Sequence, residues 1–237
     1  ESGGFESVKF DGSPVAKATR ERLTVLRPQL LLLAGLSLPA VLTGQAGPQT
    51  AARIGAGWPL TDSVIVTEAS RGMVVSGNRI ASEVGRDIMA NGGNAIDAAV
   101  AVGFALAVVH PEAGNIGGGG FMVIRLANGL AFALDYRETA PGRATANMYV
   151  GPDGNPTDKS WTGHLAVGVP GAVAGLAQAH SRFGKLPWAT VVEPAVRLAR
   201  DGFLVDDYRA RSIGSDSARL IRFRASARQF LPGGRPP

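Results

Sequence analysis

The chain has 237 residues, of which 45% are hydrophobic and 18% are charged, so it can bury a sizeable core as one domain or two small ones. Cysteine is absent, which excludes disulfide frameworks, thiolate metal sites and a cysteine nucleophile. The formal net charge of +5 arises at the two ends, because residues 58–200 hold eleven basic and eleven acidic side chains. We therefore expect no nucleic-acid partner, which would need a basic folded body.

The beginning of the chain has the pattern of a secretory leader. Basic residues from Lys17 to Arg27 precede an apolar run at 30–42, and small residues follow at Gly44 and Ala46. The run is too short for a stable membrane span and contains a proline. A buried apolar helix is the alternative interpretation. We favour the signal, and with it a secreted or periplasmic protein.

The next residues predict one strand and two helices. The apolar run 72–76 suits a buried strand. A helix follows from about Arg79, and the glycine pair 92–93 ends it. Asn94 then caps a second helix over 95–109. Because this helix is apolar nearly all round, we expect it to be central and covered on most sides.

A β-hairpin is expected after these helices. Two apolar segments, 121–126 and 130–135, are joined by Asn128-Gly129, which is a strong hairpin signal. The second strand runs directly into Arg137.

Two helices are expected beyond the hairpin. Pro170 opens the first and Gly184 closes it. The second spans about 188–200 and ends at Gly202, and Pro194 should kink or split it.

The end of the chain changes character. Seven arginines and one acidic residue lie between Arg209 and Arg235, so we expect this tail to be solvated or poorly ordered. The chain therefore divides into a leader with the signal, a linker, a folded region and an arginine-rich tail: 1–47, 48–70, 71–206 and 207–237.

Four consecutive glycines, Gly117, Gly118, Gly119 and Gly120, allow two interpretations. A phosphate-binding loop would lead from a strand into a helix, with a lysine nearby in the P-loop case. Here the run leads into a strand and has no adjacent lysine. We favour a structural role, in which the chain passes close to another backbone or adopts left-handed angles.

Arg137 is the strongest candidate for ligand binding. It follows an apolar strand, where a guanidinium can hold a carboxylate through two parallel hydrogen bonds. A structural ion pair with Asp135 or Glu138 is an equal alternative from the local sequence. The three histidines show no zinc-ligand spacing and no serine to activate, so we expect no metal site.

Six blocks of this sequence together resemble the large-subunit region of gamma-glutamyltransferases, also called gamma-glutamyltranspeptidases or glutathione hydrolases. Their order and spacing agree over about residues 70 to 206, and the cephalosporin acylases share much of the pattern. The blocks are 72–76, 92–102, 110–122, 134–141, 168–175 and 198–203.

The resemblance implies an α+β fold, the four-layer αββα sandwich of N-terminal-nucleophile hydrolases, here as an incomplete N-terminal portion. The family's precursor cuts itself and frees a threonine that attacks the gamma-glutamyl amide of glutathione. The acyl group then passes to water or to an amino-acid or peptide acceptor. No cofactor is needed, because a free α-amine can activate its own hydroxyl and backbone donors can stabilise the oxyanion.

The resemblance also implies residue roles. Arg137 corresponds to the arginine that holds the α-carboxylate of the gamma-glutamyl group, with Glu138 as support and Asp135 as a weaker partner. The threonine junction of the small subunit does not occur in these residues, so we expect a fragment that is inactive alone. The alternatives are a cephalosporin-acylase-like amide hydrolase and a non-catalytic secreted binding module.

Overall fold

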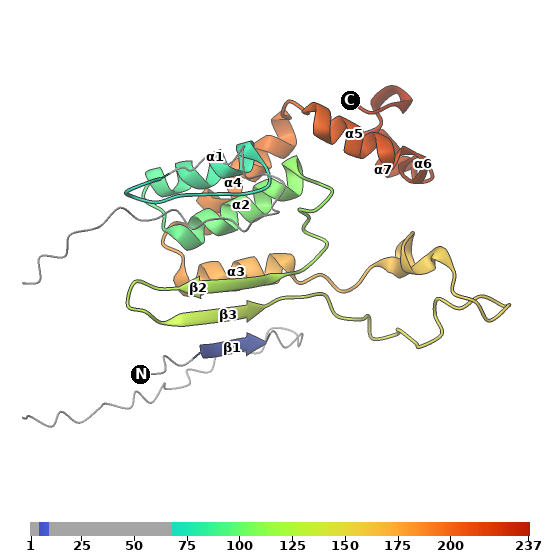
Figure 1. Cartoon of the computed structure of the whole chain (residues 1–237), viewed down its shortest axis with the longest axis horizontal. Coiled ribbons are helices and arrows are strands. Elements are labelled where there is room, and N and C mark those ends of the chain that lie inside the picture. The colour runs from blue at the N-terminus through green and yellow to red at the C-terminus, as the bar shows by residue number, and fades with distance from the viewer. Residues whose placement is uncertain (1–4, 10–67) are drawn as a thin grey trace, which may run out of the picture. The chain divides into compact units, whose positions relative to one another are not determined.

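The computed structural model describes residues 5–9 and 68–237 (Figure 1). Residues 5–9 and 72–237 belong to the first of the chain's two units. The predicted signal at 30–42 and most of the predicted linker lie outside the described residues. The first unit contains β1 Phe5–Lys9, α1 Arg79–Ala90, α2 Ala95–Val109, β2 Phe121–Arg125, β3 Ala131–Asp135, α3 Ala172–Phe183, α4 Trp188–Asp201, α5 Asp207–Ser215, α6 Ser217–Leu220 and α7 Arg224–Phe230. Short 3-10 helices lie at Asp158–Ser160, His164–Ala166 and Pro232–Gly234.

The first two helices begin at the positions expected from the sequence, and each has an asparagine cap. The Asn78 side chain accepts hydrogen bonds from the backbone N–H groups of Ile80 and Ala81 at the start of α1. Asn94 and Asp97 form a reciprocal capping box at the start of α2. Asp97 is fully buried, and its carboxylate also accepts hydrogen bonds from the backbone of Lys185. The N-terminus of α2 is therefore tied to the segment between α3 and α4.

The sheet has the strand order β1-β3-β2, with β1 parallel and β2 antiparallel to β3. The predicted hairpin is confirmed, and Gly129 takes a positive φ of 86° in its turn. Side chains alternate between the two faces of a strand. Accordingly Ile124 is 3% exposed and its neighbour Val123 is 72% exposed. One face of the hairpin is therefore covered and the other is open within the described chain.

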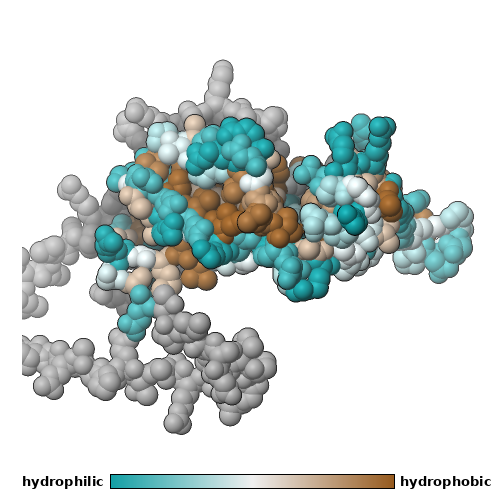
Figure 2. Space-filling view, turned by 90° about the horizontal axis from the view of Figure 1, so that it is seen from above, coloured by the Kyte–Doolittle hydropathy of each residue, from teal (hydrophilic) through white to brown (hydrophobic). Residues whose placement is uncertain are grey.

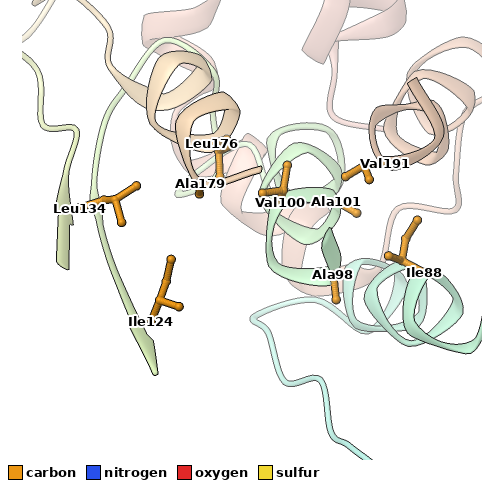
Figure 3. Packing of buried hydrophobic residues seen from close by; sticks show 9 residues of the cluster. All are labelled: Ile88, Ala98, Val100, Ala101, Ile124, Leu134, Leu176, Ala179 and Val191. Carbon is orange, nitrogen blue, oxygen red and sulfur yellow. The ribbon is translucent and has the colours of Figure 1, made fainter. Parts of the chain in front are cut away.

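The core lies between the covered face of the sheet and the helices. In Figure 3, Leu134 of β3 points toward Leu176 and Ala179 of α3, and Val100 of α2 lies beyond them. Helix α2 packs against α1, α3 and α4, so the expectation that it is central is confirmed. Helix α4 continues through Pro194, so this proline does not split it.

Helices α1 and α4 pack mainly on α2 rather than on each other. A hollow of about 520 Å³ lies between them, lined in part by Val84, Ile88, Ala189 and Pro194. Seen from this side, apolar residues gather in the middle of the helical layer and hydrophilic residues surround them (Figure 2). The helical layer is therefore open at its centre within the described chain.

Two expectations differ from the structure. Residues 72–76 do not form a strand, since no described strand lies beside them to take up their backbone hydrogen bonds, and only Val74 among them packs on the core. The tail after residue 206 contains three helices rather than a poorly ordered segment. The guanidinium of Arg209 is buried there and donates to the carbonyl oxygen of Val109 at 2.6 Å, which fixes α5 against the end of α2.

Candidate functional site

The hairpin ladder continues for one residue pair beyond its strands. Tyr136 N–H donates to the Gly120 carbonyl oxygen at 3.0 Å, and Gly120 N–H donates to the Tyr136 carbonyl oxygen at 3.3 Å. Burial of the Tyr136 side chain raises the pKa of its hydroxyl. Because successive side chains alternate, an inward Tyr136 directs Arg137 to the open face. Arg137 thus emerges where the regular sheet ends.

The glycine run lies against the backbone that carries Arg137. A Cβ atom at Gly119 would lie 2.8 Å from the Arg137 Cα and 2.8 Å from the Glu138 nitrogen. None of the four glycines has a positive φ. Of the two structural roles expected for the run, the close approach of two backbones therefore applies and left-handed backbone angles do not. The Gly118 carbonyl oxygen accepts hydrogen bonds from Gly171 and Ala172 at 2.9 Å, where α3 begins. The run therefore joins the end of β3 to the start of α3.

The Arg137 side chain is 61% exposed and has one carboxylate beside it. Its Nε lies 3.2 Å from Glu138 Oε2. Asp135 instead accepts a hydrogen bond from the backbone N–H of Arg137, at 3.1 Å from Oδ1. The structure thus brings Glu138, and not Asp135, to the guanidinium. The aromatic ring of Phe121 lies on another side of it, with Arg137 Cζ 5.9 Å from the ring centroid.

Backbone segments surround the Glu138 side chain. A Cβ atom at Gly118 would lie 3.2 Å from Glu138 Oε1, and one at Gly168 would lie 3.0 Å from Glu138 Cβ. Glu138 Oε2 is buried and accepts no hydrogen bond among the described residues, although it forms the ion pair with Arg137. The Arg137–Glu138 contact is therefore an ion pair whose geometry does not meet the criteria of a hydrogen bond. The Glu138 carboxylate is positioned by the close packing of the backbone around it.

Two of the three histidines contact parts of the fold other than this site. His110 contacts Arg209, with 3.1 Å between Nδ1 and Nη2, and His180 Nε2 lies 2.9 Å from the Leu186 carbonyl oxygen. His164 lies in a short 3-10 helix. Within residues 5–9 and 68–237 no group of three histidine or acidic side chains has the arrangement of a metal site.

Three features of the site could not be predicted from the sequence. The ring of Phe121 beside Arg137, the inward Tyr136 and the approach of Gly171 to the Tyr136 backbone all depend on contacts between distant segments. The register of the hairpin could have indicated Phe121, because residues facing each other across the turn follow from its position.

The family described as Gamma-glutamyltranspeptidase matches residues 81–237 of this chain. The chain belongs to the gamma-glutamyltranspeptidase family. The resemblance drawn from the six sequence blocks is thereby confirmed. The family match also includes the arginine-rich tail, which lies beyond the six matching sequence blocks.

Relatives and solved structures agree with membership in the gamma-glutamyltranspeptidase family. A glutathione hydrolase proenzyme of Escherichia coli (strain K12) is 56% identical over 140 residues, which are 59% of this chain and 24% of that protein. The acylase ACY 1 proenzyme of Pseudomonas sp. (strain V22) is 46% identical over 174 residues, 70% of this chain and 31% of that protein. The crystal structure of Helicobacter pylori gamma-glutamyltranspeptidase superposes with a TM-score of 0.70 at 43% identity, covering 73% of this chain and 50% of that one.

These comparisons confirm the fold class. The solved neighbours are gamma-glutamyltranspeptidases and acylases, which are N-terminal-nucleophile hydrolases, and the described residues show a mixed helix and sheet portion of that fold. The chain spans about a quarter to a third of the length of the curated relatives.

Proposed function

We propose that this chain supplies the carboxylate-binding part of an enzyme that cleaves the gamma-glutamyl amide of glutathione. The gamma-glutamyl group would pass to a threonine hydroxyl supplied by a small subunit, with release of the amine. Water or an amino-acid or peptide acceptor would then take the acyl group from the threonine. The Escherichia coli relative is a glutathione hydrolase proenzyme, and membership in the same family supports the same activity here.

One observation carries the role of this chain in that reaction. The Arg137 guanidinium is exposed at the end of β3, and its Nε faces Glu138. Neither of its terminal nitrogens donates a hydrogen bond to a described residue. Two parallel N–H donors on that free edge match a carboxylate. The α-carboxylate of a gamma-glutamyl group is therefore the ligand that we assign to Arg137, with Glu138 orienting the guanidinium.

The test is to change Arg137 to lysine in the complete enzyme. Lysine retains the charge but loses the planar fork, so the KM for a gamma-glutamyl donor should rise by about 10- to 100-fold, the equivalent of one charge-assisted hydrogen bond of roughly 1.5–3 kcal/mol. In the 237-residue chain, Arg137→Ala should abolish binding of glutathione measured by calorimetry.

The matched control is Arg143→Lys, because Arg143 is also exposed and lies six residues further along the chain. This variant should leave the KM for the donor unchanged. Equal kinetics for the Arg137→Lys enzyme and the unmodified enzyme would refute the assignment of Arg137.

A second candidate is the amide bond of a cephalosporin side chain, because the crystal structure of a cephalosporin acylase from Bacillus halodurans superposes with a TM-score of 0.60 at 28% identity. The two activities differ in the group that Arg137 must recognise. An enzyme that hydrolyses cephalosporin side chains faster than gamma-glutamyl amides would favour this alternative.

We also propose that the protein is exported to the periplasm or secreted, as the basic and apolar pattern of the leader indicates. Among the described residues no helix has both the length and the apolar character needed to cross a membrane. Fractionation of cells that express the complete protein tests the location, and its accumulation in the cytoplasm would contradict export.

A further inference from the structure

The hairpin register brings Phe121 and Arg137 to the same face of the sheet. Phe121 pairs with Asp135 in the antiparallel ladder. Arg137 lies two residues beyond Asp135, so its side chain leaves the sheet on the face that carries Phe121. Diagonal neighbours of this kind lie about 7–8 Å apart, within reach of an aromatic ring and a long side chain. The 5.9 Å between Arg137 Cζ and the Phe121 ring centroid is the result.

The position directly across from Arg137 carries no side chain. The ladder pairs Gly120 with Tyr136, and the residue before Gly120 is Gly119, where a Cβ atom would strike the Arg137 backbone. No side chain of the glycine run therefore competes with Phe121 for the guanidinium. The Phe121 ring and the Glu138 carboxylate both lie beside the guanidinium.

We propose that Phe121 is a positioning residue for Arg137, an inference that rests on the proposed function. The negative face of an aromatic ring attracts a cation within about 6 Å. Glu138 engages Nε, and the Phe121 ring lies beside the guanidinium, so the two contacts together restrict the rotation of the side chain. An exposed arginine would otherwise sample many rotamers and lose that freedom on binding. Phe121 thus presents the free terminal nitrogens to a carboxylate.

The geometry can be tested without a ligand, by NMR of the 237-residue chain. The ring current of Phe121 should shift the Arg137 Nε–H resonance, and Phe121→Leu should remove the shift. Phe121→Tyr should retain it, because the aromatic face remains. Val123→Leu is the control, since Val123 is exposed two residues further along the same strand. An Nε–H resonance that does not move in Phe121→Leu would overturn the inference.

The effect on binding is tested by titrating the same variants with glutathione. Phe121→Leu should weaken binding by about 2- to 5-fold, the range of an exposed cation–π contact, while Phe121→Tyr and Val123→Leu keep the affinity of the unmodified chain. If Arg137→Ala abolishes binding but Phe121→Leu leaves it unchanged, the role of Phe121 is refuted and the proposed function stands. If Arg137→Ala leaves binding unchanged, the proposed function fails and the inference fails with it.

Discussion

The placement of Arg137 depends on residues that have no reactive group. Gly119 permits the close approach of two backbones, and Tyr136 occupies the opposite face of the strand end. The side chain of Arg137 then leaves the sheet beside Phe121 and Glu138. At the scale of single residues, the absence of a Cβ atom is thus as important to the site as the guanidinium.

Gly119→Ala should destabilise the chain and displace Arg137. The added methyl group would lie within 2.8 Å of the Arg137 Cα and the Glu138 nitrogen, which are backbone atoms that cannot rotate away. Overpacking of this kind costs about 1–3 kcal/mol. Urea unfolding measures the loss, and the NMR resonance of the Arg137 Nε–H reports the displacement.

The matched control is Gly117→Ala in the same glycine run. The nearest atom to a Cβ at Gly117 is Asn115 Oδ1 at 3.7 Å, which is an ordinary contact. This variant should therefore change the free energy of unfolding by less than about 0.5 kcal/mol. If the two alanine variants unfold at the same urea concentration, close packing at Gly119 is not what the position requires.

At the scale of elements, the sequence predicted those whose ends depend on local chemistry. Asn94 marks the start of α2, and Gly129 marks the hairpin turn, because a side-chain cap or a positive φ involves only a few neighbouring residues. The strand predicted at 72–76 was wrong, because a strand needs a neighbouring strand for its backbone hydrogen bonds and the local sequence does not show whether one is present. The many arginines of the tail predicted a solvated segment, because charged side chains usually face water. Arg209 is instead buried and contacts Val109 and Asp206.

Acidification should release the start of α5. Asp206 caps this helix by accepting a hydrogen bond from the Arg209 N–H at 2.9 Å, and that bond, with the Arg209 charge, lowers the pKa of the Asp206 carboxyl. Because the pKa in the folded chain is below the ordinary value, the contribution to stability is present above about pH 4 and is lost as the pH falls through the folded value. Hydrogen-exchange protection of the Arg209 amide should decrease in that range.

Asp206→Asn separates the charge from the cap, because asparagine also caps helices but does not ionise in this range. Protection of the Arg209 amide should then be independent of pH below about pH 4. The control, Asp207→Asn, alters the adjacent acid and should keep the pH dependence of the unmodified chain. A decrease in protection that persists in Asp206→Asn would assign the titration to another group.

At the scale of the whole unit, one central helix organises the described fold. Helix α2 contacts α1, α3 and α4, and the sheet reaches this core through α3. The sequence predicted that centrality from the apolar surface of the helix. It also predicted Arg137 at a strand end, but not its neighbours, since Phe121 and Gly171 come from other segments. The role proposed for Arg137 rests on the match of the six blocks to the family, because the local sequence allowed an ion pair equally well.

The coverage of the β2–β3 hairpin on one face makes a prediction about two adjacent residues. Ile124 is 3% exposed and packs in the core, whereas Val123 is 72% exposed. Ile124→Thr removes a buried methyl group and replaces a buried methylene group by a hydroxyl, so it should lower the free energy of unfolding by about 2–4 kcal/mol. Val123→Thr makes a comparable exchange on the open face and should change it by less than about 0.5 kcal/mol. Urea unfolding of the 237-residue chain gives both values. Equal losses for the two variants would mean that the open face is also covered in solution, because only burial makes a hydroxyl costly on a strand.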